Sequence, residues 1–331
     1  MDICLFEKND LPSVGALWNE CVCNGDVLYR KFDAAYFAEK FLNQSYSEKE
    51  LILVAVEKGE VVGFIAGCRK HEFLRNETEE NTPGYLTTIM VKPAFRKTGI
   101  GSALLTALET RFRQAGKRYL DVSSLNPIDL DWIIPGTPGH EHNNMPGIDE
   151  QGSGYAFLLK RGYAPQVHEV AMYMDLSGYA PSPEVEEKRA ALKASGITAG
   201  IYDPAENCAF DRMCDRVGSE YWRKVLRDEL ACEAPRPILA ARCDGEIVGF
   251  TGPVDLQSNG RGWFTGICTD PEFEKRGIAT VLFNDLMCEF KKIGAQYSSL
   301  FTGTENHAQR LYLHTGFRPA RYFAILRKEL V

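Results

Sequence analysis

The sequence predicts an α/β protein that contains two copies of one domain. In each copy an apolar strand is followed by a turn with a Pro and by a charged, Gly-containing loop that opens a helix. The first such segment begins at residue 89 and the second at residue 267, which places them 178 residues apart. The apolar positions of the two following helices keep this spacing, as do Gly116 and Gly294, which stand where the helices should end. A register that stays constant over this length indicates a duplicated domain.

Each element of the first copy follows from its local pattern. Apolar residues four positions apart predict a helix with one buried face at 99–115, and Gly59 marks a turn between two strands. In order, we expect a strand at 3–6, helices at 11–23 and 33–42, strands at 51–56, 61–67 and 85–91, the helix at 99–115, a strand at 119–123, a short helix at 154–160 and a strand at 168–174.

The second copy is expected to repeat this order. Its predicted elements are a strand at 198–202, helices at 205–217 and 220–230, strands at 238–241, 247–253 and 262–269, a helix at 277–293, a strand at 296–301, a helix at 306–314 and a strand at 322–328. Between the copies, Ser182, Pro183 and Glu184 favour the start of a polar linker helix that runs to 194. The predicted domains are therefore residues 1–176 and 197–331, with a linker at 177–196.

The composition is that of an ordinary globular protein without a nucleic-acid or membrane partner. A net charge of −7 at pH 7 leaves no broad basic surface for nucleic acid, and no apolar run reaches the length of a membrane span. The ten Cys are scattered, so their spacing does not indicate a zinc site, and we predict no metal. Since the N-terminus lacks the pattern of an export signal, we expect a cytoplasmic protein with reduced thiols.

The order of elements, together with the loop pattern [Gln/Arg]-x-x-Gly-x-[Gly/Ala] at the start of the third helix, resembles the GNAT N-acetyltransferases. The resemblance covers essentially the whole chain, because the family pattern occurs once in each copy. The loop at 96–101 fits the pattern fully, whereas the loop at 274–279 begins with Glu in place of Gln or Arg. The resemblance implies two α/β (α+β) domains, each with a mixed, mainly antiparallel sheet flanked by helices.

In that family the loop N–H groups hold the pyrophosphate of acetyl-CoA, the acetyl donor, and the preceding strand holds the pantetheine arm. Several N–H donors and a helix dipole suit two phosphates, and glycines let them approach closely. The implied cofactor residues of the first copy are Val91, Arg96, Lys97, Thr98, Gly99, Ile100, Gly101 and Ser102. Those of the second copy are Ile267, Cys268, Thr269, Lys275, Arg276, Gly277, Ile278, Ala279, Thr280 and Asn306.

The two copies differ at the position of the catalytic acid. The segment 306–317 resembles the family pattern in which a Tyr, here Tyr312, donates a proton to the departing CoA thiolate, as a phenol protonated at neutral pH can do. Aligning Gly162 with Gly316 places Leu158 at this position in the first copy, and Tyr155 lies about one helical turn away. The resemblance thus implies a catalytic C-terminal domain and a degenerate N-terminal domain that keeps the cofactor loop, an organisation similar to that of mycothiol synthase.

Two further features of the sequence bear on the site. The same alignment gives the first copy 24 extra residues within 126–151, which we interpret as a structureless loop that is either a lid over the first cleft or part of the second domain's acceptor pocket. His140 and His142 in this loop favour a polar surface over a metal site. Cys268 is interpreted as a buried thiol rather than a nucleophile, because no His adjoins it. Candidate general bases, left unranked, are Glu220, Glu233, Asp270 and Glu305.

The sequence therefore predicts an N-acetyltransferase that passes an acetyl group from acetyl-CoA to a primary amine, expected to belong to a small molecule. The amine attacks directly in the C-terminal domain, with Tyr312 as the general acid. Three alternatives stay open: a protein acceptor, another acyl group in a pocket shaped by Trp263 and Phe264, and a CoA-binding or regulatory module without turnover. The sequence does not indicate the oligomeric state.

Overall fold

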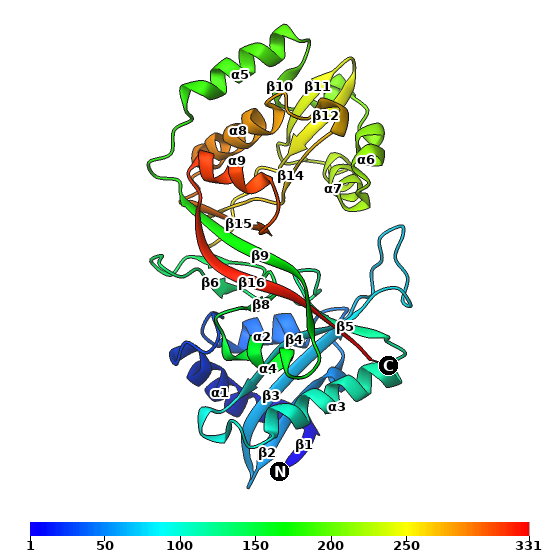
Figure 1. Cartoon of the computed structure of the whole chain (residues 1–331), viewed down its shortest axis with the longest axis vertical. Helices are drawn as coiled ribbons and strands as arrows, with labels where there is room; N and C mark the ends of the chain where they lie inside the picture. Colours follow the sequence, from blue (N-terminus) through cyan, green and yellow to red (C-terminus); the bar gives the residue numbers. More distant parts are fainter. Residues whose placement is uncertain (331) are drawn as a thin grey trace. The chain divides into compact units, whose positions relative to one another are not determined.

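A computed structural model describes residues 1–330 of the chain and divides it into two compact units (Figure 1). The first unit contains Met1–Ala171 and the chain from Ala320 onwards, and the second unit contains Met172–Pro319. This division differs from the predicted boundaries at 176 and 197, because the last strand of the chain belongs to the first unit. Among the described residues, no helix has both the length and the apolar character needed to cross a bilayer.

The first unit is a sheet with helices on both faces. Its strand order is β1 (Asp2–Leu5), β2 (Ile52–Glu57), β3 (Glu60–Arg69), β4 (Gly84–Val91), β5 (Tyr119–Val122) and β16 (Arg318–Glu329). Neighbouring strands are antiparallel except β4 and β5, which are parallel. Its helices are α1 (Leu11–Cys23), α2 (Ala34–Phe41), α3 (Ile100–Gln114) and α4 (Ser153–Leu159).

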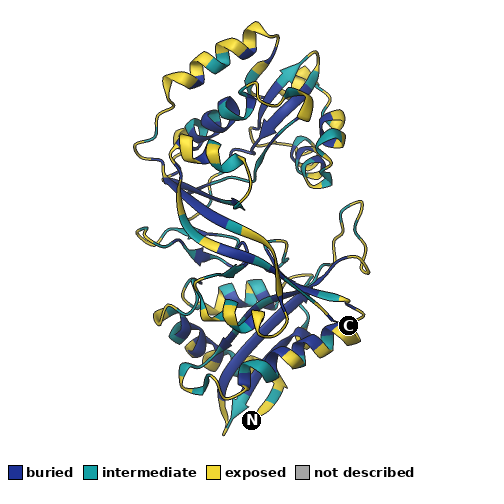
Figure 2. Cartoon of the chain, viewed as in Figure 1, coloured by how far each residue is buried: buried dark blue, intermediate teal, exposed yellow. Residues whose placement is uncertain are grey.

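Two hydrophobic cores sandwich this sheet. One core joins α1 and α2 to the sheet and contains Trp18, Phe37 and Phe41. The other joins α3 and α4 to the opposite face and contains Leu104 and Leu158. Strands β2, β3 and β4 are buried along most of their length because helices cover both of their faces (Figure 2).

Strand β16 comes from the other end of the sequence and completes the sheet of the first unit. It pairs with β5 in antiparallel register from Leu326 opposite Val122 to Glu329 opposite Tyr119. Arg327 makes two hydrogen bonds of 2.8 Å to the buried Asp121, and Lys328 holds the buried Glu109 at 2.7 and 2.8 Å. Without β16, Asp121 would lose Arg327, and Glu109 would keep only the longer contact of 3.8 Å to Arg113, so the strand is part of the fold of the first unit.

The second unit repeats the first with shorter strands. One sheet has the order β10 (Thr198–Ile201), β11 (Leu239–Cys243), β12 (Glu246–Thr251) and β14 (Ile267–Thr269). Strand β13 (Arg261–Trp263) pairs with β15 (Tyr297–Gly303), which in turn lies next to the end of β9 (Ala164–Asp175). The helices are α5 (Pro183–Ala194), α6 (Asp211–Val217), α7 (Glu220–Leu230), α8 (Ile278–Lys292) and α9 (Ala308–Thr315).

Three predictions about local structure were wrong. The predicted strand at 262–269 is interrupted between Trp263 and Ile267, because β13 pairs with β15 whereas β14 pairs with β12. The predicted helix at 205–217 is a single 3-10 turn followed by α6. The insertion is not structureless. It contains the paired strands β6 (Trp132–Ile133) and β7 (Glu141–His142) and also β8 (Ile148–Asp149), and the Trp132 side chain is fully buried.

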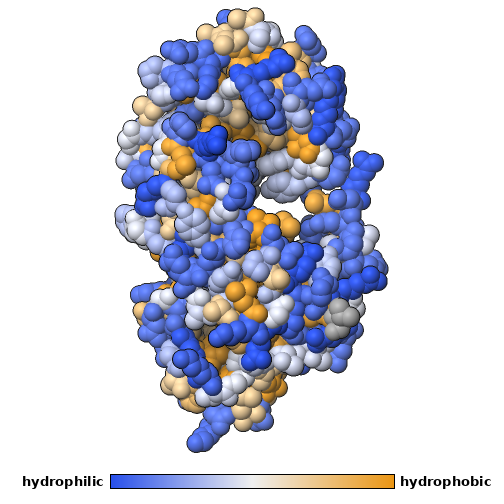
Figure 3. Space-filling model, in the orientation of Figure 1, coloured by the Kyte–Doolittle hydropathy of each residue, from blue (hydrophilic) through white to orange (hydrophobic). Residues whose placement is uncertain are grey.

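Most of the surface drawn in Figure 3 is hydrophilic, with hydrophobic residues in separate small groups. Large apolar side chains that are well exposed, such as Leu125 at 67% and Ile201 at 50%, lie far apart in the sequence. Single exposed apolar residues of this kind are normal on protein surfaces.

Candidate active site

The two predicted phosphate loops have nearly the same backbone. Each follows a one-turn 3-10 helix, Pro93–Phe95 or Pro271–Phe273, and precedes a helix of 15 residues. In the first loop the φ angles of Lys97 and Gly99 are +62° and +97°, and in the second loop those of their counterparts are +60° and +94°. These left-handed residues turn the chain so that the free N–H groups of α3 and α8 open outwards, which is a suitable arrangement for a phosphate.

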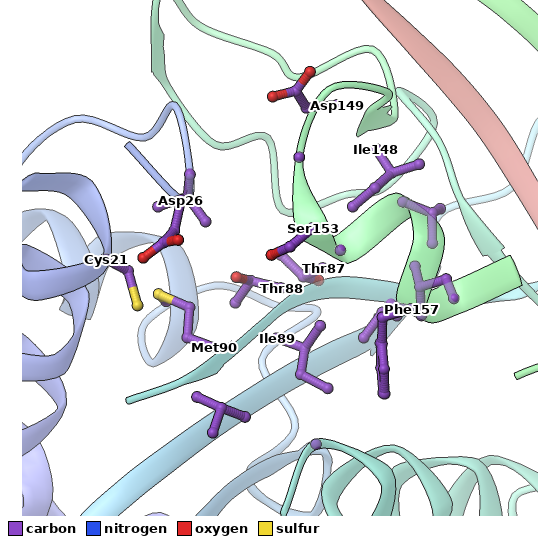
Figure 4. Close-up of a pocket in the computed structure, with 18 of the residues that line it drawn as sticks. Cys21, Asp26, Thr87, Thr88, Ile89, Met90, Ile148, Asp149, Ser153 and Phe157 are labelled. Carbon is purple, nitrogen blue, oxygen red and sulfur yellow. The ribbon is translucent and has the colours of Figure 1, made fainter. Parts of the chain in front are cut away.

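In the first unit this loop stands at one end of a cavity of about 610 Å³, which we call the first-unit cleft (Figure 4). Strands β4 and β5 pair only at Gly84 with Leu120 and at Tyr85 with Asp121, and then separate. From Leu86 onwards β4 therefore has one free edge, which lines the cleft together with α4 and the start of α3. An extended ligand can use the backbone groups of a free edge as a neighbouring strand would.

The loop end of the cleft carries positive charge. Lys97, Lys160 and Arg161 line it, together with Gly99 and Ser102 from the start of α3. The Arg161 guanidinium donates a hydrogen bond to the Ser102 hydroxyl, which places its charge at the helix N-terminus. Cations beside free N–H groups suit a pyrophosphate.

The side chain of Arg96, the first residue of the loop pattern, is bonded to other groups of the protein. Its Nε donates to the Val91 carbonyl at 3.0 Å, and its Nη1 and Nη2 donate to the Asp26 carboxylate at 2.7 and 2.6 Å. Arg96 thereby fastens the loop to the end of β4 and to the segment after α1. In the second unit Glu274 is exposed at this position, and a carboxylate cannot donate these bonds.

The insertion forms part of the wall of the first-unit cleft. Asn126, Met145 and Ile148 belong to this part of the wall, and the Asn126 amide donates to the Thr87 hydroxyl at 3.0 Å. Thr87 is the extra residue of a β-bulge in β4, because Thr88 pairs with Ala66 and Leu86 with Gly67. Bulges are common beside active sites because they redirect side chains. Both predicted roles, a lid over the first cleft and a part of the second domain's acceptor pocket, stay predictions, and the insertion is seen to line the first cleft.

The equivalent places in the second unit are covered by side chains. A Cβ added at Gly277 in the second loop would lie 3.3 Å from the Lys188 side chain of α5, whereas one added at Gly99 would have nothing within 4 Å. At the strand break, a Cβ on Gly266 would lie 2.0 Å from the Trp222 ring of α7. The second loop therefore has the backbone of a phosphate site, with side chains packed over both ends of the region.

Tyr312, the predicted general acid, lies in an aromatic cluster of the second unit. Its ring centroid is 5.0 Å from that of Phe283 and 5.9 Å from that of Phe264, which belongs to the strand break. The side chain is 5% exposed, and burial raises the pKa of its hydroxyl well above the usual value for Tyr. The phenol is thus protonated at neutral pH, as an acid must be, but it is also part of a core.

Most of the other site residues predicted in the second unit are buried or bonded to neighbouring groups of the protein. Burial raises the pKa of Cys268 to about 12, so this thiol is protonated and a poor nucleophile. Asp270 pairs with Arg216 at 3.0 Å, and Glu220 pairs with Arg223 at 3.3 Å. Asn306 accepts a hydrogen bond of 2.9 Å from the Ala308 N–H and so caps the start of α9. The remaining base candidates, Glu233 and Glu305, are exposed.

Sequence reasoning missed three side chains that the structure brings to these sites. Thr88 lines the first-unit cleft, Arg161 lies at its phosphate end, and Trp222 covers the matching region of the second unit. The sequence held a signal for Thr88, because the 178-residue spacing aligns it with Gly266, so the two copies differ at this position. The roles of Arg161 and Trp222 depend on tertiary packing, which the repeat does not reveal.

Comparison with known proteins decides the family. The family model described as "Acetyltransferase (GNAT) family" matches residues 20–130 and 205–317, one stretch in each unit. The chain belongs to the GNAT acetyltransferase family. It therefore carries two domains of this family, as the sequence predicts, and the family uses acyl-CoA donors.

Relatives support this assignment. The aminoglycoside N(6')-acetyltransferase type 1 of Stenotrophomonas maltophilia is 36% identical over 81 residues, 24% of this chain. This match covers 52% of that relative, so the chain spans about half the length of the curated relative it matches.

Solved structures show that the whole chain has a tandem GNAT fold. A GCN5-related N-acetyltransferase from Sphaerobacter thermophilus matches 99% of this chain and 95% of its own, with a TM-score of 0.65 and 19% identity. A tandem GNAT protein from the clavulanic acid biosynthesis pathway matches 100% of this chain and 98% of its own, with a TM-score of 0.56 and 13% identity. The glucosamine N-acetyltransferase region of a fungal GH3 β-N-acetylglucosaminidase matches 99% of this chain and 38% of that protein, with a TM-score of 0.69 and 17% identity.

Proposed function

We propose that this GNAT enzyme transfers the acetyl group of acetyl-CoA to a primary amine of a small molecule, with the donor held in the first-unit cleft. The observation that carries the proposal is the position of the cleft, which begins at the phosphate loop and continues along the free edge of β4. In this arrangement the pyrophosphate meets the start of α3, and the pantetheine arm extends along β4 towards the bulge. The amine nitrogen then attacks the thioester carbon, and the bond from that carbon to sulfur breaks. The nitrogen loses one proton, and the departing thiolate takes up one from solvent and leaves as the CoA thiol.

The polar groups of the first-unit cleft suit a polar amine. Asn126, Thr88 and Ser153 line the cleft together with the carboxylate of Asp149. Arg321 holds that carboxylate at 2.8 and 2.6 Å, so it is fixed in position. Two of the relatives act on amino sugars or aminoglycosides according to their names, which makes glucosamine and kanamycin the first acceptors to test.

A second candidate places the chemistry in the second unit, with Tyr312 as the general acid. It is favoured by a protonated phenol beside the strand break and by a loop whose backbone matches the first. On this candidate Lys188 and Trp222 must move before acetyl-CoA binds. Loss of a general acid typically costs a factor of about 10² to 10⁴, so Tyr312→Phe would then abolish most of the turnover.

A matched pair of substitutions separates the two candidates. Ser102 and Thr280 are each the third residue of their helix, where a carboxylate is favourable for the helix but repels a bound phosphate. We expect Ser102→Asp to weaken acetyl-CoA binding in calorimetry by about tenfold or more, because it places like charge beside the phosphates. It should also lower the release of CoA thiol with glucosamine or kanamycin.

Thr280→Asp is the control and should leave both measurements within twofold of the wild type. The opposite pattern would move the reaction to the second unit and make Tyr312 its acid. If neither substitution changes acetyl-CoA binding, the donor does not bind at either loop, and the proposal fails.

A further inference from the structure

One hydroxyl in the first-unit cleft is buried without a partner. Thr88 is 4% exposed, and its Oγ1 has no hydrogen-bond partner among the described residues. The Tyr29 hydroxyl lies beside it, yet no hydrogen bond of ordinary geometry joins the two. Leaving a buried hydroxyl unpaired is unfavourable by about 1–3 kcal/mol, so such a group requires an explanation.

The position of Thr88 points to a ligand. It follows the bulge of β4, lines the cleft, and projects into the same space as Ser153 and Met90 (Figure 4). It lies three residues before Val91, which is about 10 Å along an extended strand. The reacting end of an acyl donor whose phosphates sit at the loop would lie close to this part of β4.

The face of the sheet identifies which reactant Thr88 meets. Tyr29, which adjoins Thr88, and Met90, two residues along the strand, both belong to the core on the α1 and α2 side. The donor lies along the free edge of β4, so a side chain on this face looks towards the other reactant, the amine.

The second unit provides a natural comparison. Gly266 occupies the position of Thr88, and the Trp222 ring lies against it, so this unit has neither the hydroxyl nor the open space. In the first unit Tyr36 stands at the position of Trp222, since Asp33 caps α2 through the Tyr36 N–H as Ser219 caps α7 through the Trp222 N–H. The Tyr36 hydroxyl accepts a hydrogen bond of 2.8 Å from the Asp131 N–H of the insertion.

We propose that the Thr88 hydroxyl is a specificity-determining group of the first-unit cleft that accepts a hydrogen bond from the N–H of the acceptor amine. This inference rests on the proposed function of the same cleft. The hydrogen bond orients the nitrogen lone pair towards the thioester carbon, and no proton is transferred to Thr88. The acceptor class is therefore a primary amine that can approach the bulge from the side of α1 and α2.

Replacement of Thr88 by Val tests this directly, because Val keeps the shape and removes the hydroxyl. We expect the KM for glucosamine or kanamycin, whichever the wild type acetylates, to rise about 10- to 100-fold, with a smaller change in kcat. The Kd for acetyl-CoA should stay within twofold. The melting temperature should stay the same or rise, since an unpaired buried hydroxyl has been removed. Thr88→Ser keeps a hydroxyl and should have a KM close to that of the wild type. Thr110→Val, on the exposed face of α3, is the control for replacing a Thr by a Val.

Each other outcome overturns the inference in a recognisable way. An unchanged KM in Thr88→Val means that the hydroxyl does not contact the amine. A weaker Kd for acetyl-CoA means that it contacts the donor instead, and a lower melting temperature means that it has a partner within the fold. If the wild type acetylates neither amine and releases no CoA thiol with either, the proposed function and the contact with Thr88 fail together.

Discussion

Glu169 on β9 is a residue whose protonation should be visible in the stability of the protein. One of its carboxyl oxygens is buried without a hydrogen-bond partner in the described chain, and burial raises the pKa from 4.5 to about 7. A carboxyl with a raised pKa in the folded state takes up a proton on folding. Its stabilising protonation is therefore complete at low pH and is lost as the pH rises through about 7.

Glu169→Gln should therefore gain stability relative to the wild type as the pH rises from 5 to 8.5. We expect a relative gain of about 1–2 kcal/mol, because the side chain is only partly buried and solvent reduces the effect. Urea unfolding at both pH values measures it. The same change at Glu187, which is exposed on α5, is the control. A difference between Glu169→Gln and the wild type that does not vary with pH would contradict the prediction.

At the scale of elements, the insertion is part of the wall of the first-unit cleft. Its Asp131 N–H donates to the hydroxyl of Tyr36, whose counterpart Trp222 lies against Gly266 in the second unit. Its anchor is Trp132, whose Nε1 donates to the Asn144 carbonyl at 2.9 Å and whose ring packs edge-on against Phe323 of β16. An indole that is fully buried and hydrogen-bonded keeps the insertion ordered.

Trp132→Ala should destabilise the first unit by about 3–5 kcal/mol, because it removes a large buried side chain and leaves a cavity. We expect the acceptor KM to rise more than the Kd for acetyl-CoA, since the insertion belongs to the wall of the cleft and not to the phosphate loop. Denaturant unfolding and initial-rate kinetics provide the two measurements. Leu125→Ala, at a site that is 67% exposed, should change stability by less than about 0.5 kcal/mol. Equal effects of the two substitutions would show that Trp132 does not anchor the insertion.

The covering of the second loop is also a property of an element. Helix α5 is fixed to α8 by Arg189, which holds Asp285 at 3.0 and 2.6 Å. In the segment before α5, the Tyr179 hydroxyl donates to Asn284 of α8 at 2.6 Å. These contacts keep Lys188 over the second loop. The first loop has no such cover at Gly99.

At the scale of the whole molecule, the last strand makes the first unit depend on the complete chain. Ending the chain after Phe317 removes β16, which contributes Ala324 and Leu326 to a core and pairs with β5. It also breaks the pairs of Asp121 with Arg327 and of Glu109 with Lys328, which leaves Glu109 only its 3.8 Å contact to Arg113. Breaking a buried pair typically costs about 3–5 kcal/mol. We expect the shortened chain to lose the unfolding transition of the first unit and its binding of acetyl-CoA.

Calorimetry and protease resistance measure this loss, and a peptide of residues 318–331 added in trans should restore part of the binding. A shortened chain that still binds acetyl-CoA as the full chain does would show that β16 is dispensable for the cleft.

The sequence predicts the fold closely where local pattern and repetition act together. Helices α1 and α7 have the predicted bounds, and the glycines that end α3 and α8 lie where the 178-residue spacing places them. The family comparison confirms the two GNAT domains. That the last strand joins the sheet of the first unit could not be predicted, because a strand of alternating pattern fits the open edge of either sheet. The open cleft could not be predicted either, since it depends on tertiary packing: Trp222 lies against Gly266 in the second unit, whereas the Tyr36 hydroxyl bonds the insertion in the first.

Strand β16 has a consequence for how the protein is made. A ribosome synthesises the first unit first, and domains generally fold as they emerge. Here the sheet of the first unit lacks its last strand until residue 329 has been added, so the half that is translated earliest is completed latest. Until then the free edge of β5 is open to other strands. A nascent chain of this protein therefore has no finished first unit, and premature termination anywhere in its second half removes the cleft encoded by its first.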